Sequence, residues 1–277
     1  MPDSNSPLPP PRVALIGFGE AGETFARSAL WRGETRGWDL LPGRRAAMAE
    51  CGVETGTDPA TALADRAFVL SLVTADAALD AARSYAPLLP EGTLWCDMNS
   101  VAPDTKREAA AAIEAAGGRY VDVAVMAPVR PAALAVPLLI SGPHALAARP
   151  LLGGLGFSNI RVVGEEIGRA SAIKMIRSVL VKGLEALTWD CAAAAEAAGV
   201  LDEIAASLDA GEKHLGWAER MAYNRERMTT HGERRAAEME EAARTLLALG
   251  VEPVMTRGTV QLQRAAATAT NEKDRAA

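Results

Sequence analysis

A glycine-rich turn near the start of the chain constrains its fold more than any other feature of the sequence. Residues 12–22 read RVALIGFGEAG, so an apolar run at residues 13–16 leads directly into three glycines, and an alanine-rich segment follows. In a strand–turn–helix unit of this kind, Gly17 permits the tight turn, Gly19 lets the backbone approach a pyrophosphate, and Gly22 lets helix and strand pack closely. The first amides of the helix and its dipole attract phosphate groups. The motif therefore predicts a dinucleotide site with contacts from Gly17, Phe18, Gly19, Glu20, Ala21 and Gly22.

An acidic residue follows at the spacing that such a site requires. Asp39 is 22 positions after Gly17, at the end of a second predicted strand at residues 37–40. Its carboxylate can accept hydrogen bonds from both hydroxyls of an adenosine ribose, and it disfavours a 2′-phosphate. Arg44 and Arg45 come soon after and can either stack on adenine or pair with that phosphate. The predicted coenzyme is therefore NAD or NADP, with NAD favoured.

Short apolar runs alternate with helical patterns as far as Gly164. The predicted strands are residues 13–16, 37–40, 67–73, 93–97, 119–125, 137–141 and 160–163, and the clearest helices between them are residues 75–85 and 103–116. Strands joined by helical crossovers form a mostly parallel sheet with helices on both faces. The first part of the chain is therefore predicted to be an α/β domain with a Rossmann-type, doubly wound sheet.

The pattern changes after Gly164. Residues 166–198 form one long Ala/Leu/Ile pattern that predicts an interdomain helix, and the sequence from there to residue 267 is almost entirely helical in composition. We predict a flexible leader at 1–11, a dinucleotide-binding domain at 12–164, an all-α substrate and dimerisation domain at 165–267, and a flexible tail at 268–277. Burial of the alanine-rich helical surface against a second copy makes a homodimer the expected assembly.

Composition narrows the classes of partner. A net charge of −6 argues against nucleic acid, because phosphate contacts need a basic surface. No apolar run approaches the ~20 residues that cross a bilayer, and the Ser/Pro-rich start has no apolar signal core, so we expect no membrane partner and a cytoplasmic location. His144 and His214 have no carboxylate or cysteine at ligand spacing, so no metal is expected. The basic cluster of His231, Arg234 and Arg235 is interpreted either as a solvated helix face or as part of an active site.

Five segments spread along the chain resemble one enzyme superfamily. They are GFGEAG at residues 17–22, SLVTADAA at 71–78, CDMNS at 96–100, VDVAVMAP at 121–128 and GRASAIKMIRSVLVKG at 168–183. On these motifs the chain resembles the beta-hydroxyacid dehydrogenases and 6-phosphogluconate dehydrogenases over nearly its whole length. The later run THGERRAAEMEEAARTL suggests a less characterised branch with its own helical C-terminal domain. The resemblance implies an NAD(P)-dependent oxidoreductase.

The resemblance also assigns acid–base catalysis to a lysine on the long helix, and the matching position is Lys174. When hydride leaves a carbinol carbon, the hydroxyl proton needs an acceptor, which a neutral amine provides. In the reverse direction the ammonium group returns the proton. The alternative is a structural lysine whose aliphatic stem covers core surface.

Other positions depart from the usual family motif. Members commonly carry Ser-Gly-Gly where this chain has Met126, Ala127 and Pro128, and proline has no amide to offer a substrate carboxylate. Three residues after the lysine, the histidine of the phosphogluconate enzymes is replaced by Arg177, and one residue later the usual asparagine is Ser178; both share the face of the lysine. Arg177 can bind a carboxylate or phosphate, or form a salt bridge at the surface or between subunits. The predicted substrate contacts are Ser100, Met126, Ala127, Arg177 and Ser178.

Two loops that follow predicted strands complete the expected site. Asn99 and Ser100 resemble the Asn-Ser of the phosphogluconate enzymes. Ligands in open α/β sheets bind beyond the carboxyl ends of the strands, where these side chains can reach the nicotinamide ribose or the substrate. The alternative is a turn and helix cap before Pro103. Val73 and Thr74 are expected to contact the coenzyme through backbone groups.

The sequence therefore predicts reversible hydride transfer between NAD(P) and a small, anionic, hydroxyacid-like alcohol, with Lys174 as the acid–base group. Two alternatives stay open. Related scaffolds reduce imines, and a chain with an altered substrate motif can also be a dinucleotide-binding sensor or regulatory protein without activity.

Overall fold

The computed structural model describes residues 12–29, 35–211 and 215–276, the last eight of these by their backbone alone. The chain forms two compact units, of which one ends at Arg177 and the other begins at Ser178. The division falls inside α7 (Arg169–Ala198), a single helix that belongs to both. The predicted domain boundary at residue 164, where the last strand ends, stays a prediction.

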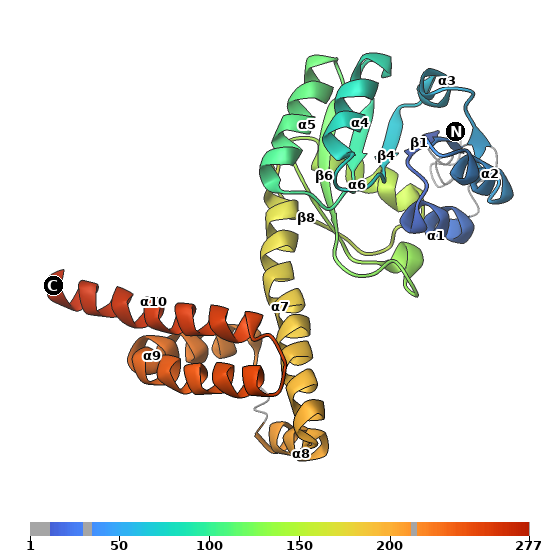
Figure 1. Cartoon of the computed structure of the whole chain (residues 1–277). Coiled ribbons are helices and arrows are strands. Elements are labelled where there is room, and N and C mark those ends of the chain that lie inside the picture. The colour runs from blue at the N-terminus through green and yellow to red at the C-terminus, as the bar shows by residue number, and fades with distance from the viewer. Residues whose placement is uncertain (1–11, 30–34, 212–214, 277) are drawn as a thin grey trace. The chain divides into compact units, whose positions relative to one another are not determined.

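Within the described residues, the first unit is built on an eight-stranded sheet (Figure 1). Its strands are β1 (Val13–Ile16), β2 (Thr35–Trp38), β3 (Glu54–Thr55), β4 (Phe68–Ser71), β5 (Leu94–Asp97), β6 (Arg119–Val125), β7 (Leu138–Ser141) and β8 (Ile160–Gly164). Their order is β3-β2-β1-β4-β5-β6-β7-β8, and neighbours are parallel except for β6 and β7. After β1 the chain forms β2 and β3 on one side of that strand, and it then returns to form β4 on the other side. The carboxyl ends of β1 and β4 therefore flank the switch point at which such sheets bind ligands.

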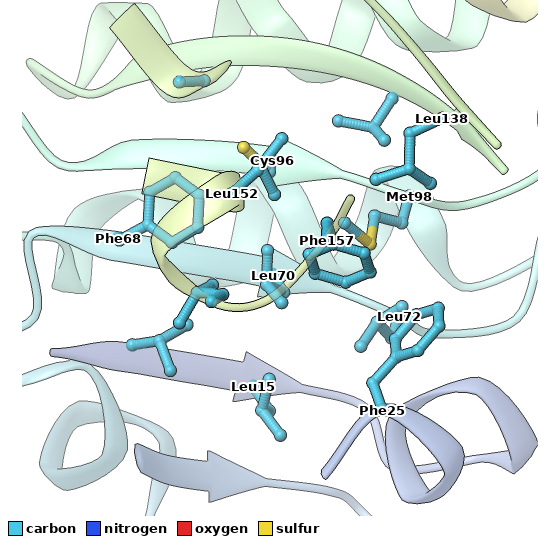
Figure 2. Close-up of a cluster of buried hydrophobic side chains, with 14 of the residues drawn as sticks. Leu15, Phe25, Phe68, Leu70, Leu72, Cys96, Met98, Leu138, Leu152 and Phe157 are labelled. Carbon is cyan, nitrogen blue, oxygen red and sulfur yellow. The ribbon is translucent and has the colours of Figure 1, made fainter. Parts of the chain in front are cut away.

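Helices cover both faces of this sheet, because alternate residues of each central strand point to opposite faces. In β1, Leu15 belongs to a core with α1 (Glu20–Ala29), α2 (Pro42–Glu50) and α6 (Ala145–Gly154). Figure 2 shows part of this core, in which the rings of Phe25 and Phe157 meet edge to face with centroids 5.0 Å apart. Its neighbour Ile16 packs on the other face with α3 (Pro59–Leu63), α4 (Ala78–Tyr85) and α5 (Pro103–Ala115).

The predicted fold class is confirmed, with local corrections. Strand β2 begins and ends two residues before the predicted range of 37–40, because Thr35 and Arg36 pair with Val13 and Ala14 of β1. Strand β3 is a two-residue polar pairing that the sequence analysis did not predict. The helix predicted at 75–85 begins at Ala78, after a turn in which Ala77 N donates to Thr74 O at 3.2 Å.

The second unit is helical throughout its described residues, as predicted. It contains the end of α7, then α8 (Leu201–Gly211), α9 (Trp217–Ala248) and α10 (Val254–Ala276). Helices α9 and α10 pack side by side as a hairpin (Figure 1). Their contact is close at Gly232, where a Cβ atom would lie 2.2 Å from the carbonyl oxygen of Gln263. Over the residues that the structure describes, no helix is long and apolar enough to span a membrane.

Candidate dinucleotide and acid–base site

The glycine-rich turn follows β1 at the switch point of the sheet. Gly17 has a φ of +87°, and its amide donates to the carbonyl oxygen of Trp38 at 2.9 Å, which ties the turn to the end of β2. A Cβ atom at position 17 would lie 2.7 Å from the carbonyl oxygen of Leu72, just beyond β4. Both the backbone conformation and the close approach therefore require glycine here.

The other two glycines of the turn have different surroundings. A Cβ atom at Gly19 would meet no atom within 4 Å, whereas one at Gly22 would lie 3.2 Å from both the carbonyl oxygen of Gly17 and the ring of Phe18. Helix α1 begins at Glu20, and the first amides of a helix have no partner within it. Open space over Gly19 beside these amides fits a pyrophosphate, so the turn fits a dinucleotide coenzyme.

The remaining residues of the turn have distinct environments. The ring of Phe18 is fully buried in the core, so it is a packing residue and only its backbone faces the turn. Ala21 is partly buried and packs against the same core. Glu20 is exposed, and its carboxylate lies 3.8 Å from Nε of Arg130. A coenzyme can therefore contact Phe18 and Ala21 mainly through their backbone, whereas at Glu20 it can also contact the Glu20–Arg130 pair.

Asp39 is the first residue after β2 and organises the neighbouring turn. Its Oδ2 accepts the amide of Phe18 at 2.7 Å, and its Oδ1 accepts the amide of Leu41 at 2.9 Å. Each carboxylate oxygen can accept a second hydrogen bond, so the ribose hydroxyls of a coenzyme still have acceptors. The carboxylate thus fixes the glycine turn as well as fitting the predicted ribose site.

The two arginines that follow Asp39 differ in how firmly they are held. Arg45 donates to the carbonyl oxygens of Asp39 at 2.6 Å and Leu40 at 3.0 Å, and its guanidinium lies 4.8 Å from the ring centroid of Trp38. The guanidinium of Arg44 is half exposed and lies 3.8 Å from the carboxylate of Glu23 on α1. Arg44 is therefore the more available cation beside the predicted adenosine position.

The loop after β4 approaches the glycine turn from the other side. Val73 is half buried and Thr74 is exposed, and the amide of Leu72 donates to the carbonyl oxygen of Ile16 at 2.7 Å. The hydroxyl of Thr74 is a hydrogen-bond partner of the Asp76 carboxylate and helps to lower its pKa. The backbone of Val73 thus lies close to Gly17, and the coenzyme contacts of Val73 and Thr74 stay a prediction.

The loop after β5 brings two predicted residues to the same edge of the sheet. Asn99 is 5% exposed, and its Nδ2 donates to Oγ of Ser71 at 3.0 Å, so its side chain holds the ends of β4 and β5 together. Ser100 is exposed, and its Oγ accepts a hydrogen bond of 2.5 Å from Nζ of Lys174 on α7. The structure therefore brings Ser100 and Lys174 together, while it gives Asn99 a structural role in the loop.

The atypical motif after β6 contacts the beginning of α7. The side chain of Met126 packs with Ile173 against Ala170, its amide donates to Pro137 O at 2.9 Å, and its carbonyl oxygen accepts Nη1 of Arg177 at 3.4 Å. Ala127 and Pro128 are exposed. Ser178, one helical turn after Lys174, is the first residue of the second unit. Met126 is thus mainly a packing residue, and Arg177 remains exposed close to its carbonyl group.

Three buried charged residues behind this edge were not predicted from the sequence, namely Asp97, Lys106 and Asp122. The sequence carries only a weak signal for them: Asp97 ends the apolar strand β5, and Asp122 lies inside the mostly apolar strand β6. No group of three His, Cys, Asp or Glu side chains among the described residues could hold a metal ion.

The sheet order and the glycine turn define a Rossmann-type dinucleotide-binding protein. Residues 12–163 match the family described as the NAD binding domain of 6-phosphogluconate dehydrogenase, and residues 195–266 match a domain of unknown function, DUF1932. The chain belongs to this 6-phosphogluconate dehydrogenase NAD-binding family, which confirms the resemblance seen in its motifs.

Solved structures extend the likeness over almost the whole chain. A conserved hypothetical protein from Sinorhizobium meliloti is 39% identical, with 96% of this chain and 92% of that chain covered and a TM-score of 0.63. The conserved protein MTH1747, of unknown function and described as similar to 3-hydroxyacid dehydrogenases, is 31% identical, with 93% of this chain and 97% of that chain covered and a TM-score of 0.60.

An imine reductase from Myxococcus stipitatus, in complex with NADP+, is 20% identical, with 94% of this chain and 95% of that chain covered and a TM-score of 0.74. A variant of that enzyme in complex with NAD+ is 21% identical, with 94% of both chains covered and a TM-score of 0.73. The fold is therefore hydroxyacid dehydrogenase-like and is shared with imine reductases.

Proposed function

We propose that this protein is an NAD(P)-dependent oxidoreductase that moves hydride between nicotinamide and the carbinol carbon of a small, anionic, hydroxyacid-like alcohol. The observation that carries the proposal is the 2.5 Å hydrogen bond from Lys174 Nζ to Ser100 Oγ. It puts a titratable amine beside a hydroxyl at the carboxyl edge of the sheet, the edge at which Rossmann-type folds bind their ligands.

The residues at this edge supply the proton chemistry of such a reaction. A bound nicotinamide coenzyme supplies or accepts the hydride. Lys174 Nζ takes the proton of the substrate hydroxyl during oxidation and returns it during reduction. The oxygen that Lys174 contacts on Ser100 marks where a substrate hydroxyl can be held. Arg177 follows on the same helix and, being exposed, can direct further N–H groups to a substrate carboxylate.

For the coenzyme we propose NAD in preference to NADP. The Asp39 carboxylate is held in place by the amides of Phe18 and Leu41, so it cannot easily turn away from a 2′-phosphate. Arg45 is committed to backbone carbonyl groups and to Trp38, which leaves Arg44 as the nearby cation that favours a phosphate. The carboxylate is given more weight because two backbone amides hold it in place, whereas the guanidinium of Arg44 is half exposed and lies 3.8 Å from Glu23.

Imine reduction is the second candidate. It is favoured by the TM-score of 0.74 to an imine reductase, and by Met126, Ala127 and Pro128 in place of the usual carboxylate-binding motif. Lys174 favours alcohol chemistry, since it can accept a hydroxyl proton. A screen of nicotinamide absorbance with hydroxyacids, polyols and imines, each with both coenzymes, separates the candidates. Turnover of a hydroxyacid supports the proposal, turnover of imines alone supports the second candidate, and coenzyme binding without turnover supports a sensor.

We further propose that the protein is a homodimer. In the second unit, the end of α7 exposes apolar side chains around most of its circumference, among them Val179 (75% exposed), Leu184 (46%) and Trp189 (76%). A helix that is apolar around most of its circumference is normally buried, and neighbouring exposed apolar side chains mark an interface. A second copy of the chain is the partner that presents a matching apolar surface.

A further inference from the structure

Three charged side chains are buried together behind the edge that carries Ser100 and Lys174. Asp97 is 1% exposed, and Lys106 and Asp122 are fully buried. The cluster sets the amine of one lysine between two carboxyl groups inside the protein. Burial of charge is costly unless each group is paired and hydrogen-bonded, so such a cluster calls for a specific role.

On one side, the cluster holds the loop that carries Ser100. Lys106 Nζ donates to Asp97 Oδ1 at 2.9 Å and to the Asp97 carbonyl oxygen at 2.6 Å. The same Oδ1 also accepts a hydrogen bond of 2.9 Å from the amide of Asn99, and Asn99 is the residue before Ser100. The direction in which the chain leaves β5 is therefore set by Asp97 and Lys106.

On the other side, the cluster holds the first turn of α7. Lys106 Nζ lies 3.5 Å from Asp122 Oδ1, and Asp122 Oδ2 accepts the amide of Ser171 at 3.0 Å. Ser141 Oγ donates to Asp122 Oδ2 at 3.2 Å and accepts the amide of Ala170 at 3.0 Å. A buried carboxylate at a helix N-terminus satisfies free amides and interacts favourably with the helix dipole. Ser171 is three residues before Lys174, so this contact fixes the turn from which the amine projects.

We propose that Asp122 and Lys106 are positioning residues that, together with Asp97, hold the Ser100 loop and the first turn of α7 at a fixed separation. This proposal rests on the function proposed above, because it gives the cluster the task of keeping Lys174 Nζ in register with Ser100 Oγ. None of the three touches the reacting atoms. Their contribution to the rate is the alignment of a proton donor, to which a reaction is sensitive at the level of about 1 Å.

The same cluster offers a matched control. Tyr120 OH donates to Asp97 Oδ2 at 2.6 Å, and burial together with the Asp97 charge raises the pKa of this phenol well above its ordinary value, so it remains a donor. Tyr120→Phe removes one buried hydrogen bond from the cluster but none of the bonds to α7. Asp122→Asn removes the charge on the α7 side and leaves Lys106 paired with Asp97. Ser141→Ala is a milder change on the α7 side.

The test measures amide hydrogen exchange of Ala170 and Ser171, the Kd of the coenzyme, and kcat with a substrate found in the screen. For Asp122→Asn we expect exchange at both amides to rise about tenfold, since the new NH2 group must face either the Ser171 amide or Lys106 Nζ, and in both cases the contact that holds α7 is weakened. We also expect kcat to fall about tenfold or more while Kd changes less than about twofold. Tyr120→Phe should lose about as much stability as Asp122→Asn. Its exchange rates at both amides and its kcat should nevertheless stay within about twofold of wild type.

The proposal is overturned if Tyr120→Phe lowers kcat as much as Asp122→Asn, or if the α7 amides of Asp122→Asn exchange at the wild-type rate. If Asp122→Asn does not fold, Ser141→Ala takes its place: it removes the acceptor of the Ala170 amide, so exchange at Ala170 must rise and kcat must fall, and wild-type values for both contradict the proposal. If wild-type protein turns over no substrate, the proposed function fails, and the exchange rates alone decide whether the cluster holds α7.

Discussion

Lys174 Nζ donates a hydrogen bond of 2.5 Å to Ser100 Oγ, although the two residues are 74 positions apart in the chain. Ser100 follows β5, and Lys174 lies on the second turn of α7. The contact exists because the first turn of α7 packs on the sheet through Ala170, which is fully buried between Ala124 and Leu139. An amine is thereby held at the edge of the sheet where the glycine turn offers room for a coenzyme.

The glycine turn gives the first prediction, which separates folding from binding. Gly19→Ala should leave the free energy of unfolding almost unchanged, because its Cβ meets no atom within 4 Å, yet it should weaken NADH binding about tenfold or more if a pyrophosphate approaches this backbone. Gly17→Ala should destabilise the fold by at least about 2 kcal/mol through its positive φ and its clash with Leu72. Calorimetric titration and chemical denaturation measure both effects.

Gly43→Ala is the control for this pair, since it lies on α2 with no atom within 4 Å of its Cβ. This variant should lower neither the free energy of unfolding nor the affinity for NADH. Unchanged NADH affinity in Gly19→Ala would place the coenzyme elsewhere.

Asp39 gives the second prediction. In Asp39→Asn, one of the two amides that the carboxylate accepts, Phe18 N or Leu41 N, faces an NH2 group, so stability should fall by about 1–3 kcal/mol. Loss of the negative charge should also shift the ratio of the NADPH and NADH dissociation constants about tenfold towards NADPH. Asp65→Asn, an exposed position outside the site, removes the same charge and should leave the ratio as in wild type. A ratio that does not respond to Asp39→Asn contradicts its placement beside the ribose.

The helical hairpin gives the third prediction. Gly232→Ala should destabilise the second unit by about 3 kcal/mol, because the new methyl group would overlap the backbone of Gln263 on α10. Gly258→Ala, on α10 with open space around it, should instead stabilise the unit by up to about 1 kcal/mol. Thermal unfolding followed by circular dichroism compares the two. Equal melting temperatures would show that α9 and α10 do not pack at Gly232.

The exposed apolar surface of α7 gives the fourth prediction. Light scattering at micromolar concentration should give the wild-type protein twice the mass of a 29.0 kDa chain. Trp189→Glu should shift the mass towards that of one chain, because the charge would be buried on association. Ala111→Glu, an equivalent change on an exposed position of α5, should leave the mass as in wild type. A monomeric wild-type protein would rule out the dimer.

The central sheet could be predicted from sequence because its strands are apolar and its turns carry glycine. The limits of β2 could not, since Thr35 and Arg36 are polar and their place in the sheet is set by pairing with β1. Thr35 is only 1% exposed despite its hydroxyl group. The two-residue strand β3 is polar and has no periodicity from which to predict it.

The parts of the candidate site that a sequence motif marks could be predicted, whereas the parts whose position depends on packing could not. The Gly17 turn and Asp39 follow from spacing alone, and Lys174 follows from a family resemblance. The burial of Lys106 could not be predicted, because it belongs to the charged run TKRE and its orientation depends on how α5 packs on the sheet. Its neighbour Arg107 is half exposed, while Lys106 is fully buried. The ring of Phe18 completes the core, so the coenzyme contact predicted for this residue is left to its backbone.

The acid–base role of Lys174 is tested most directly by the turnover of Lys174→Met on the substrate that the screen identifies, beside Lys182→Met, which removes an exposed lysine from the same helix. If Lys174 is the acid–base group, kcat of Lys174→Met falls by about 100-fold or more, while its NADH dissociation constant is unchanged and Lys182→Met stays active. Full turnover by Lys174→Met would contradict this role.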